Sequence, residues 1–177
     1  MTALASPRPT PFRASIPWLI VAVAGCVLLY ALLVWGPQRG LPLRPHAPEW
    51  RWLSQQTGVL QLHVGSALAA FVLGLVQLTG VKGATWHRRL GWLWAGLMAT
   101  VAVSSLFIHN INPGGFSWIH ILSGWSLVIL PLGLYAARRH DMAAHRRHMT
   151  GLFVGALVIA GMLTFFPGRS LWRVFLG

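Results

Sequence analysis

The pattern of hydrophobic and polar positions divides the chain into five apolar runs joined by short polar segments. Each run is about 20 residues long, which is enough for a helix to cross about 30 Å of hydrocarbon. Lipid offers no partner to backbone N–H and C=O groups, so apolar runs of this length predict transmembrane helices. The five runs are Pro17–Gly36, Gly58–Gly80, Leu90–His109, Trp118–Ala137 and Met149–Pro167.

This pattern predicts an all-α integral membrane protein with five transmembrane helices and no separate soluble domain. Residues 17–36 are expected to form an anchor helix that follows a cytoplasmic N-terminal tail, residues 1–16. The other four helices, within residues 58–167, are expected to form one four-helix bundle in the membrane. Residues 168–177 then form a short C-terminal tail.

Histidines recur at matching positions in the two halves of this bundle. His63 and His120 are 57 residues apart, and His87 and His145 are 58 residues apart. The spacing predicts a parallel two-hairpin repeat, in which each hairpin carries one histidine near each membrane surface. The two copies are residues 58–109 and residues 117–167.

Composition and charge agree with a membrane setting. Apolar residues make up 55% of the chain and charged residues only 9%, which is too few for a soluble surface. The net charge of +12 would favour a nucleic-acid partner in a soluble protein. Here, however, nine of the 14 basic residues are expected on the same side of the membrane as the N-terminus. Because cytoplasmic loops are rich in Lys and Arg, we expect a bacterial inner-membrane protein with a cytoplasmic N-terminus, an external C-terminus and no nucleic-acid partner. The nine residues are Arg8, Arg13, Lys82, Arg88, Arg89, Arg138, Arg139, Arg146 and Arg147.

The ionisable residues inside the apolar runs limit the chemistry. The only carboxylates, Glu49 and Asp141, fall between the runs. Their absence from the spans disfavours carboxylate proton relays, sodium sites and carboxylate-bridged di-iron centres. The lone Cys26 has no histidine spaced for a structural zinc site. Any chemistry in the membrane is therefore expected to use imidazole.

The first histidine pair is expected near the external surface. His63 and His120 open the second and fourth spans, so they should lie at similar depth. Small residues follow the same helix face, and they could leave a slot that accepts a porphyrin. Close packing of membrane helices favours small residues too, and it stays an alternative. The residues on these faces are Ala67, Ala70, Gly74, Gln77 and Gly124.

The second pair, His87 and His145, is expected near the cytoplasmic surface. Each histidine is followed by Arg-Arg, and Arg88 and Arg146 could pair with the propionates of a heme held there. Arginines at a cytoplasmic helix end are equally typical of contact with lipid headgroups. His148, one helical turn from His145, is an alternative ligand on this side. His109 is an alternative ligand on the external side.

Three motifs carry a resemblance to a known family: His63-x-Gly65, His87-Arg88-x-x-Gly91 and His145-Arg146-x-x-Met149. They resemble those of a family of bacterial integral-membrane proteins of unknown function, over about residues 58–169, and this resemblance implies no activity. The layout is also similar to transmembrane diheme b-type cytochromes, in which alternate helices supply the two ligands of each heme. By that resemblance His63 and His120 would hold one heme b, and His87 and His145 a second. The inner histidines lie nearer the membrane surface than in better-known members.

These observations predict transmembrane electron transfer through one or two bis-histidine b hemes, as part of a membrane oxidoreductase. The expected partners are the lipid bilayer, a redox partner or quinol-like small molecule, and a second copy of the chain. The main alternative is a cofactor-free membrane scaffold or small transporter whose histidines pack between helices. Copper or other metal handling is a third interpretation.

Overall fold

The computed structural model describes residues 46–108, 118–166 and 169–176, together with positions 23, 25–31, 34, 38 and 40. The predicted N-terminal tail, most of the predicted anchor helix and His109 lie outside these residues.

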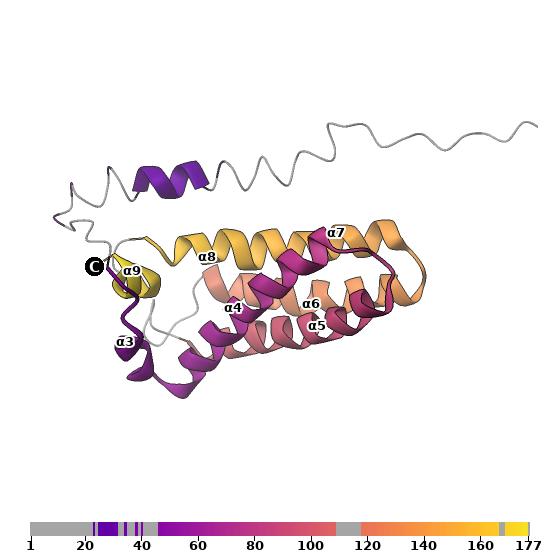
Figure 1. Ribbon diagram of the computed structural model, residues 1–177, viewed down its shortest axis with the longest axis horizontal. Helices are drawn as coiled ribbons and strands as arrows, with labels where there is room; N and C mark the ends of the chain where they lie inside the picture. Colours follow the sequence, from indigo (N-terminus) through magenta and orange to yellow (C-terminus); the bar gives the residue numbers. More distant parts are fainter. Residues whose placement is uncertain are drawn as a thin grey trace, which may run out of the picture.

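The described residues from 46 onward are all-helical and contain no strand. Two helical hairpins account for most of them, and the last long helix includes a π-helical stretch, η2 (Figure 1). Helices α7, η2 and α8 follow one another without a break and form one rod. The elements are α3 (Trp50–Ser54), α4 (Gly58–Thr79), α5 (Thr85–Ser105), α6 (Trp118–Arg138), α7 (Met142–Leu152), η2 (Phe153–Ile159), α8 (Ala160–Leu163) and α9 (Ser170–Phe175).

Side-chain caps and left-handed turn residues set several helix ends. Thr57 caps α4 by accepting a hydrogen bond from the Leu60 N–H, and Asp141 caps α7 by accepting from the Ala144 N–H at 2.9 Å. Helix α5 begins at Thr85 and has no side-chain cap, because Ala84 precedes it. His140, exposed in the turn between α6 and α7, has a φ of 58°.

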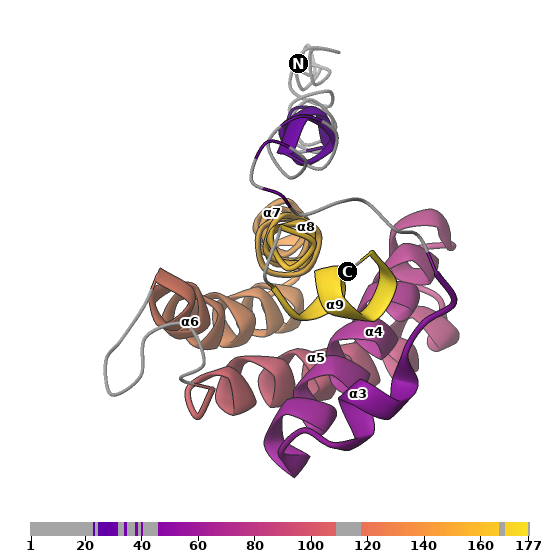
Figure 2. The ribbon, with the colours of Figure 1, turned by 90° about the vertical axis from the view of Figure 1, so that its left-hand side faces the viewer.

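The four long rods pack in a closed ring. Helix α4 packs on α5, α5 on α6, and α6 on α7 and η2, and η2 packs back against α4. Figure 2 shows this ring from one end. Helix α4 therefore lies opposite α6, and α5 lies opposite the α7 rod. Residues that face inward from opposite rods are brought towards the bundle axis.

The middle of the bundle is filled with large apolar side chains. Trp94 of α5 donates its indole N–H to the Ala70 carbonyl of α4 at 3.0 Å. Phe153 of η2 stacks on Phe71 with ring centroids 5.6 Å apart, and Met98 is fully buried beside them. Because the indole N–H and its carbonyl acceptor satisfy each other, this aromatic centre leaves no polar atom of Trp94 unpaired.

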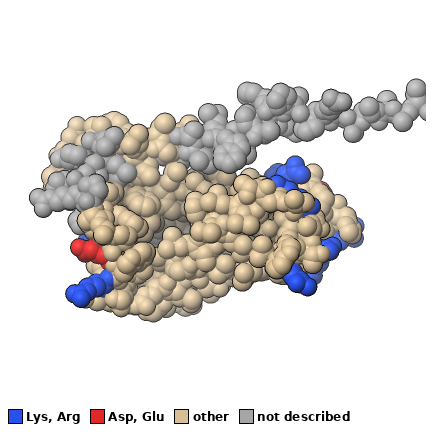
Figure 3. Space-filling view, viewed as in Figure 1, with Lys and Arg blue, Asp and Glu red and all other residues tan. Residues whose placement is uncertain are grey.

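The outer surface of the ring is apolar along most of its length. Figure 3 shows charged side chains at the two ends and an uncharged band between them. Two described helices, Gly58–Thr79 and Ile119–Arg138, are long and apolar enough to cross a membrane. Helix α5 carries polar residues in its first turn, and the fourth rod is divided by the π-helical stretch.

One end of the ring is covered by α3 and α9, and we call it the cap end. The His46 N–H donates to the Phe175 carbonyl and the Glu49 N–H to the Val174 carbonyl, at 3.2 and 3.0 Å. Trp50 meets the Phe175 ring edge-on at 6.4 Å. The other end, which we call the basic end, carries the α4–α5 and α6–α7 turns. Its basic residues are Lys82, Arg88, Arg89, Arg138, Arg139, Arg146 and Arg147.

Candidate histidine sites at the two ends of the bundle

At the cap end, His63 of α4 reaches across to α5. Its Nδ1 lies 3.1 Å from the Val101 carbonyl oxygen and 3.0 Å from the Ser104 hydroxyl. A carbonyl can only accept a hydrogen bond, so Nδ1 carries the proton and Nε2 keeps a lone pair. The ring is thus held in one tautomer by the neighbouring helix.

His120, in the first turn of α6, lies at the same level as His63. It is only 6% exposed. Two adjacent residues of α5 establish the common level: Ser104 contacts His63, and Ser105 is hydrogen-bonded to Ser123, one turn after His120. Since α4 and α6 are opposite rods, the two histidines approach the bundle interior from opposite sides.

The buried polar side chains of the described residues all belong to this part of the bundle, which we call the serine layer. Ser104 donates its hydroxyl proton to the Thr100 carbonyl, and Ser123 and Ser126 donate theirs to carbonyls of α6. The hydroxyl protons are used mainly within their own helices, so the oxygens remain as acceptors facing neighbouring helices. The serine layer comprises Ser66, Ser104, Ser105, His120, Ser123 and Ser126.

At the basic end, His145 of α7 is anchored like His63. Its Nδ1 lies 2.9 Å from the Gly133 carbonyl oxygen of α6, which again fixes the proton on Nδ1 and leaves a lone pair on Nε2. His63 and His145 are therefore each tied to a backbone carbonyl of their hairpin partner. One histidine at each end of the bundle therefore has this anchor, although the two anchored residues do not occupy matching positions of the predicted repeat.

His87, which precedes the apolar part of α5, lies near His145. Burial lowers the pKa of His87, with further lowering from the neighbouring basic groups of His145 and Lys82. Gln77 of α4 donates to the His87 carbonyl at 3.0 Å and fixes the first turn of α5. The Nδ1 of His87 is buried and has no hydrogen-bond partner. The pairing of His87 with His145 as ligands of one group stays a prediction.

His148, the alternative to His145, packs against α6. Its Cβ is 3.1 Å from the position that a Cβ would take at Gly133, and its Nδ1 is buried without a hydrogen-bond partner. His148 therefore stays an alternative to His145 on this side.

The predicted porphyrin slot is wrong at two of its residues. A Cβ at Gly74 would collide with the Phe153 ring and lie 3.0 Å from Trp94 Nε1, so large side chains occupy this space. Gly124 lies on the exposed surface of α6, because His120, Ser123 and the residues in register with them take the inner face. The small residues along α4 instead allow side chains of neighbouring helices to pack closely. Close helix packing is the alternative interpretation that the sequence analysis gave for these residues.

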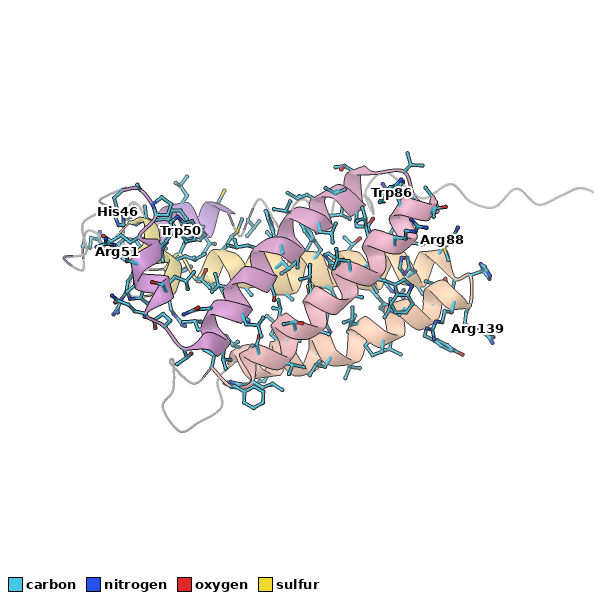
Figure 4. The ribbon with its side chains drawn as sticks, turned by 60° about the horizontal axis from the view of Figure 1, so that its bottom comes forward. His46, Trp50, Arg51, Trp86, Arg88 and Arg139 are labelled. Carbon is cyan, nitrogen blue, oxygen red and sulfur yellow. The ribbon has the colours of Figure 1, made fainter. Side chains whose placement is uncertain are left out.

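Charged residues near the histidines remain on the surface. Arg88 and Arg146 are exposed, and no ion pair joins residues within the described ranges. Figure 4 shows Trp86, Arg88 and Arg139 at the basic end, opposite His46, Trp50 and Arg51 at the cap end. The part of the chain that the structure describes has no cluster of three or more His, Cys, Asp or Glu side chains that could hold a metal ion.

The sequence analysis did not single out Ser104, Ser105 or Ser126. The Ser104 hydroxyl is the one that contacts His63. The sequence feature that could have identified them is the Ser104-Ser105 pair at the end of the apolar part of α5.

A comparison with protein families matches residues 60–171 to the family described as "Predicted membrane protein (DUF2306)". The chain belongs to the DUF2306 family. The match spans nearly all of the four-rod ring of this DUF2306 protein, including all four paired histidines, and it begins after α3. Comparisons with curated proteins and with solved structures gave no match. Family membership thus confirms the resemblance seen in the motifs and agrees with the uncharged band around the bundle, which indicates contact with a lipid bilayer.

Proposed function

We propose that this DUF2306 protein transfers electrons across a membrane through one or two bis-histidine b-type hemes. The observation that carries the proposal is the pair of anchored imidazoles on different rods. His63 and His145 each donate Nδ1–H to a carbonyl and keep Nε2 as a lone-pair donor. A hydrogen bond of this kind orients a ligating imidazole and increases its basicity.

The donor set fits heme ligation at each end of the bundle. His63 and His120 would hold a heme at the cap end, and His87 and His145 would hold one at the basic end. His148 and His109 remain alternates. Bound there, the group would supply one-electron chemistry. The aromatic centre around Trp94 and Phe153 fills the middle of the ring, so each heme is confined to its own end.

The surrounding residues would serve the two sites differently. At the cap end the serine layer would provide hydrogen-bond acceptors that fix the imidazole tautomers. It contains no carboxylate, Lys or Arg. At the basic end Arg88 and Arg146 are exposed and could pair with propionates. A quinol-like reductant or a redox protein would exchange electrons at one of these ends, and a second copy of the chain could pack along the apolar surface.

The finer membrane topology is part of the proposal. It has five spans, with the last four as a parallel two-hairpin repeat in which His63 corresponds to His120 and His87 to His145. Seven basic residues lie at the basic end and three at the cap end among the described residues, which supports a cytoplasmic basic end in the bacterial inner membrane. The three are Arg51, Arg169 and Arg173.

The test is the visible spectrum of the detergent-purified protein. We expect a reduced-minus-oxidised spectrum with the sharp bands of low-spin, six-coordinate heme b, and a heme content of one or two per chain. A colourless protein from heme-replete cells, together with no uptake of added hemin, contradicts the proposal.

A specific observation favours a second function, that of a cofactor-free membrane scaffold or small transporter. Phe153 and Trp94 fill the space at Gly74, and the Nδ1 atoms of His63 and His145 already have partners within the protein. In that case the histidines stabilise the hairpins and bind no metal. The colourless outcome above is the result expected for this function.

A further inference from the structure

A second feature, separate from the paired histidines, lies on the outside of the basic end between α5 and α6. The guanidinium of Arg138 sits over the ring of Trp92, with its carbon 5.5 Å from the ring centroid. Arg88 lies one turn before Trp92 on α5, and Tyr135 lies one turn before Arg138 on α6. These four residues, Arg88, Trp92, Tyr135 and Arg138, form what we call the α5–α6 seam.

The seam is exposed, and no acidic side chain among the described residues neutralises its positive charge. Trp92 is 55% exposed and Tyr135 59%, and both arginines are exposed. The one acidic residue near this end, Asp141, uses its carboxylate to cap α7. No ion pair joins the residues that the structure describes, so the guanidinium groups of the seam lack an anionic partner within it.

The position of Arg138 over Trp92 favours an anion on its outer side. A guanidinium held over an aromatic ring keeps N–H groups free for other partners, and these groups match two oxygens of a phosphate. Trp and Tyr are also the side chains that favour the level of lipid headgroups. The seam therefore combines an oriented phosphate donor with two side chains suited to the membrane interface.

The neighbouring surface indicates which phosphate-bearing molecule the seam meets. Leu93 of α5 and Leu132 of α6, towards the middle of the bundle, are 56% and 46% exposed. A ligand on the seam thus lies with its phosphate at the arginines and its remaining bulk along an apolar surface. A phospholipid has this arrangement, whereas a nucleic acid or a free phosphate lacks the apolar part.

We propose that the α5–α6 seam is a binding site for an anionic phospholipid, whose phosphate contacts Arg88 and Arg138 and whose acyl chains lie along α5 and α6. A lipid bound here holds the ends of the two hairpins together, because α5 belongs to the first hairpin and α6 to the second. The site needs no heme, so it stands whether or not the proposed electron transfer does.

The test uses the full-length protein in nanodiscs that contain equal amounts of phosphatidylcholine and phosphatidylglycerol. Native mass spectrometry after release into detergent counts the phosphatidylglycerol molecules retained by each chain. We expect Arg138→Gln to retain about fivefold less phosphatidylglycerol, and Trp92→Leu about threefold less although it keeps every charge. Arg173→Gln, at the cap end, is the matched control and should retain as much as the wild type.

Two further measurements keep the outcome interpretable. Thermal unfolding in phosphatidylcholine alone identifies any variant that fails to fold, and Arg138→Lys then replaces Arg138→Gln because it keeps the charge and loses the planar stacking. Equal retention by wild type, Trp92→Leu and Arg173→Gln overturns the proposal, since it would indicate diffuse attraction to the whole basic end. Displacement of the lipid by millimolar inorganic phosphate overturns it too, because the seam would then recognise the phosphate alone.

Discussion

The two ends of the bundle carry histidine pairs from matching positions of the sequence but hold them in contrasting surroundings. At the cap end His120 is buried among serines. At the basic end His87 is half-buried in the first turn of α5, close to Lys82 and to a surface of arginines. The shared element is the anchor, in which a backbone carbonyl of the hairpin partner holds Nδ1 of His63 or His145.

The difference shows that histidines with similar spacing in the sequence do not have equal surroundings at the two ends. Polar groups inside a membrane bundle must be satisfied by protein, and the serine layer provides this at the cap end. Near the headgroups, water and lipid phosphates can satisfy them, so a similar layer is not needed at the basic end. The cap-end pair is therefore expected to be the more rigid and the more selective of the two. The predictions below test this contrast from the largest expected effect to the smallest.

The largest effect concerns which end faces the cytoplasm. Alkaline phosphatase fused after Asp141, at the basic end, should be inactive, whereas a fusion after Gly177 should be fully active, because the enzyme folds only outside the cytoplasm. A green fluorescent protein at the same two positions is the control and should give the reverse pattern. Active phosphatase after Asp141 would exchange the two ends of the bundle in the membrane.

The next effect separates the two histidine pairs. We expect His63→Ala to abolish heme binding at the cap end. Among the described residues, His120 is the only other histidine at this level, and one histidine cannot supply both ligands. His87→Ala should leave more heme bound, since its site is near water and His148 can approach. Heme content per chain, measured on purified protein, checks both.

The control for these variants is His140→Asn, because Asn tolerates the left-handed backbone that His140 adopts in its exposed turn. It should bind as much heme as the wild type. Equal losses from His63→Ala and His87→Ala would remove the contrast between the two ends.

The sequence predicted the long helices well where lipid contact dictates their composition. Helix α4 ends within a residue of the apolar run that predicted it, and so does α6. Helices α5 and α7 begin earlier than their apolar runs, at Thr85 and Met142, because their first turns are polar. The length of an apolar run cannot reveal such turns.

Other features depend on contacts that the sequence does not encode locally. Helices α3 and α9 are short, and they are held by the backbone hydrogen bonds at His46 and Glu49. The serine layer leaves no signature because each serine can satisfy its hydroxyl within its own helix. The matching spacing of the histidines was visible in the sequence, but the filling of the space at Gly74 by Phe153 was not.

A smaller effect is expected at the aromatic centre that separates the two ends. A side chain at position 74 would collide with the Phe153 ring, so Gly74→Leu should lower the free energy of unfolding by about 1–3 kcal/mol through overpacking. Gly65→Leu is the matched control on the same helix, because nothing lies within 4 Å of a Cβ there. Thermal unfolding in detergent measures both. An unchanged Gly74→Leu protein would mean that the centre opens readily enough to admit a larger group.

The smallest effect tests whether the serine layer holds His63 in place. Ser104→Ala removes one of the two acceptors of the His63 Nδ1–H and leaves the Val101 carbonyl, so the free energy of unfolding should fall by about 1 kcal/mol. Thr100→Val is the matched control, because the Thr100 hydroxyl bonds only to the Gly96 carbonyl of its own helix, and it should be nearly neutral.

The double variant Ser104→Ala/His63→Ala isolates the contact itself. If the hydroxyl acts through the imidazole, the double variant should lose about 1 kcal/mol less than the sum of the single losses. Strict additivity would mean that Ser104 stabilises α5 alone. The cap-end imidazole would then be held by a single carbonyl, as His145 is at the basic end, and the hydrogen bonds to the two imidazoles would no longer differ between the ends.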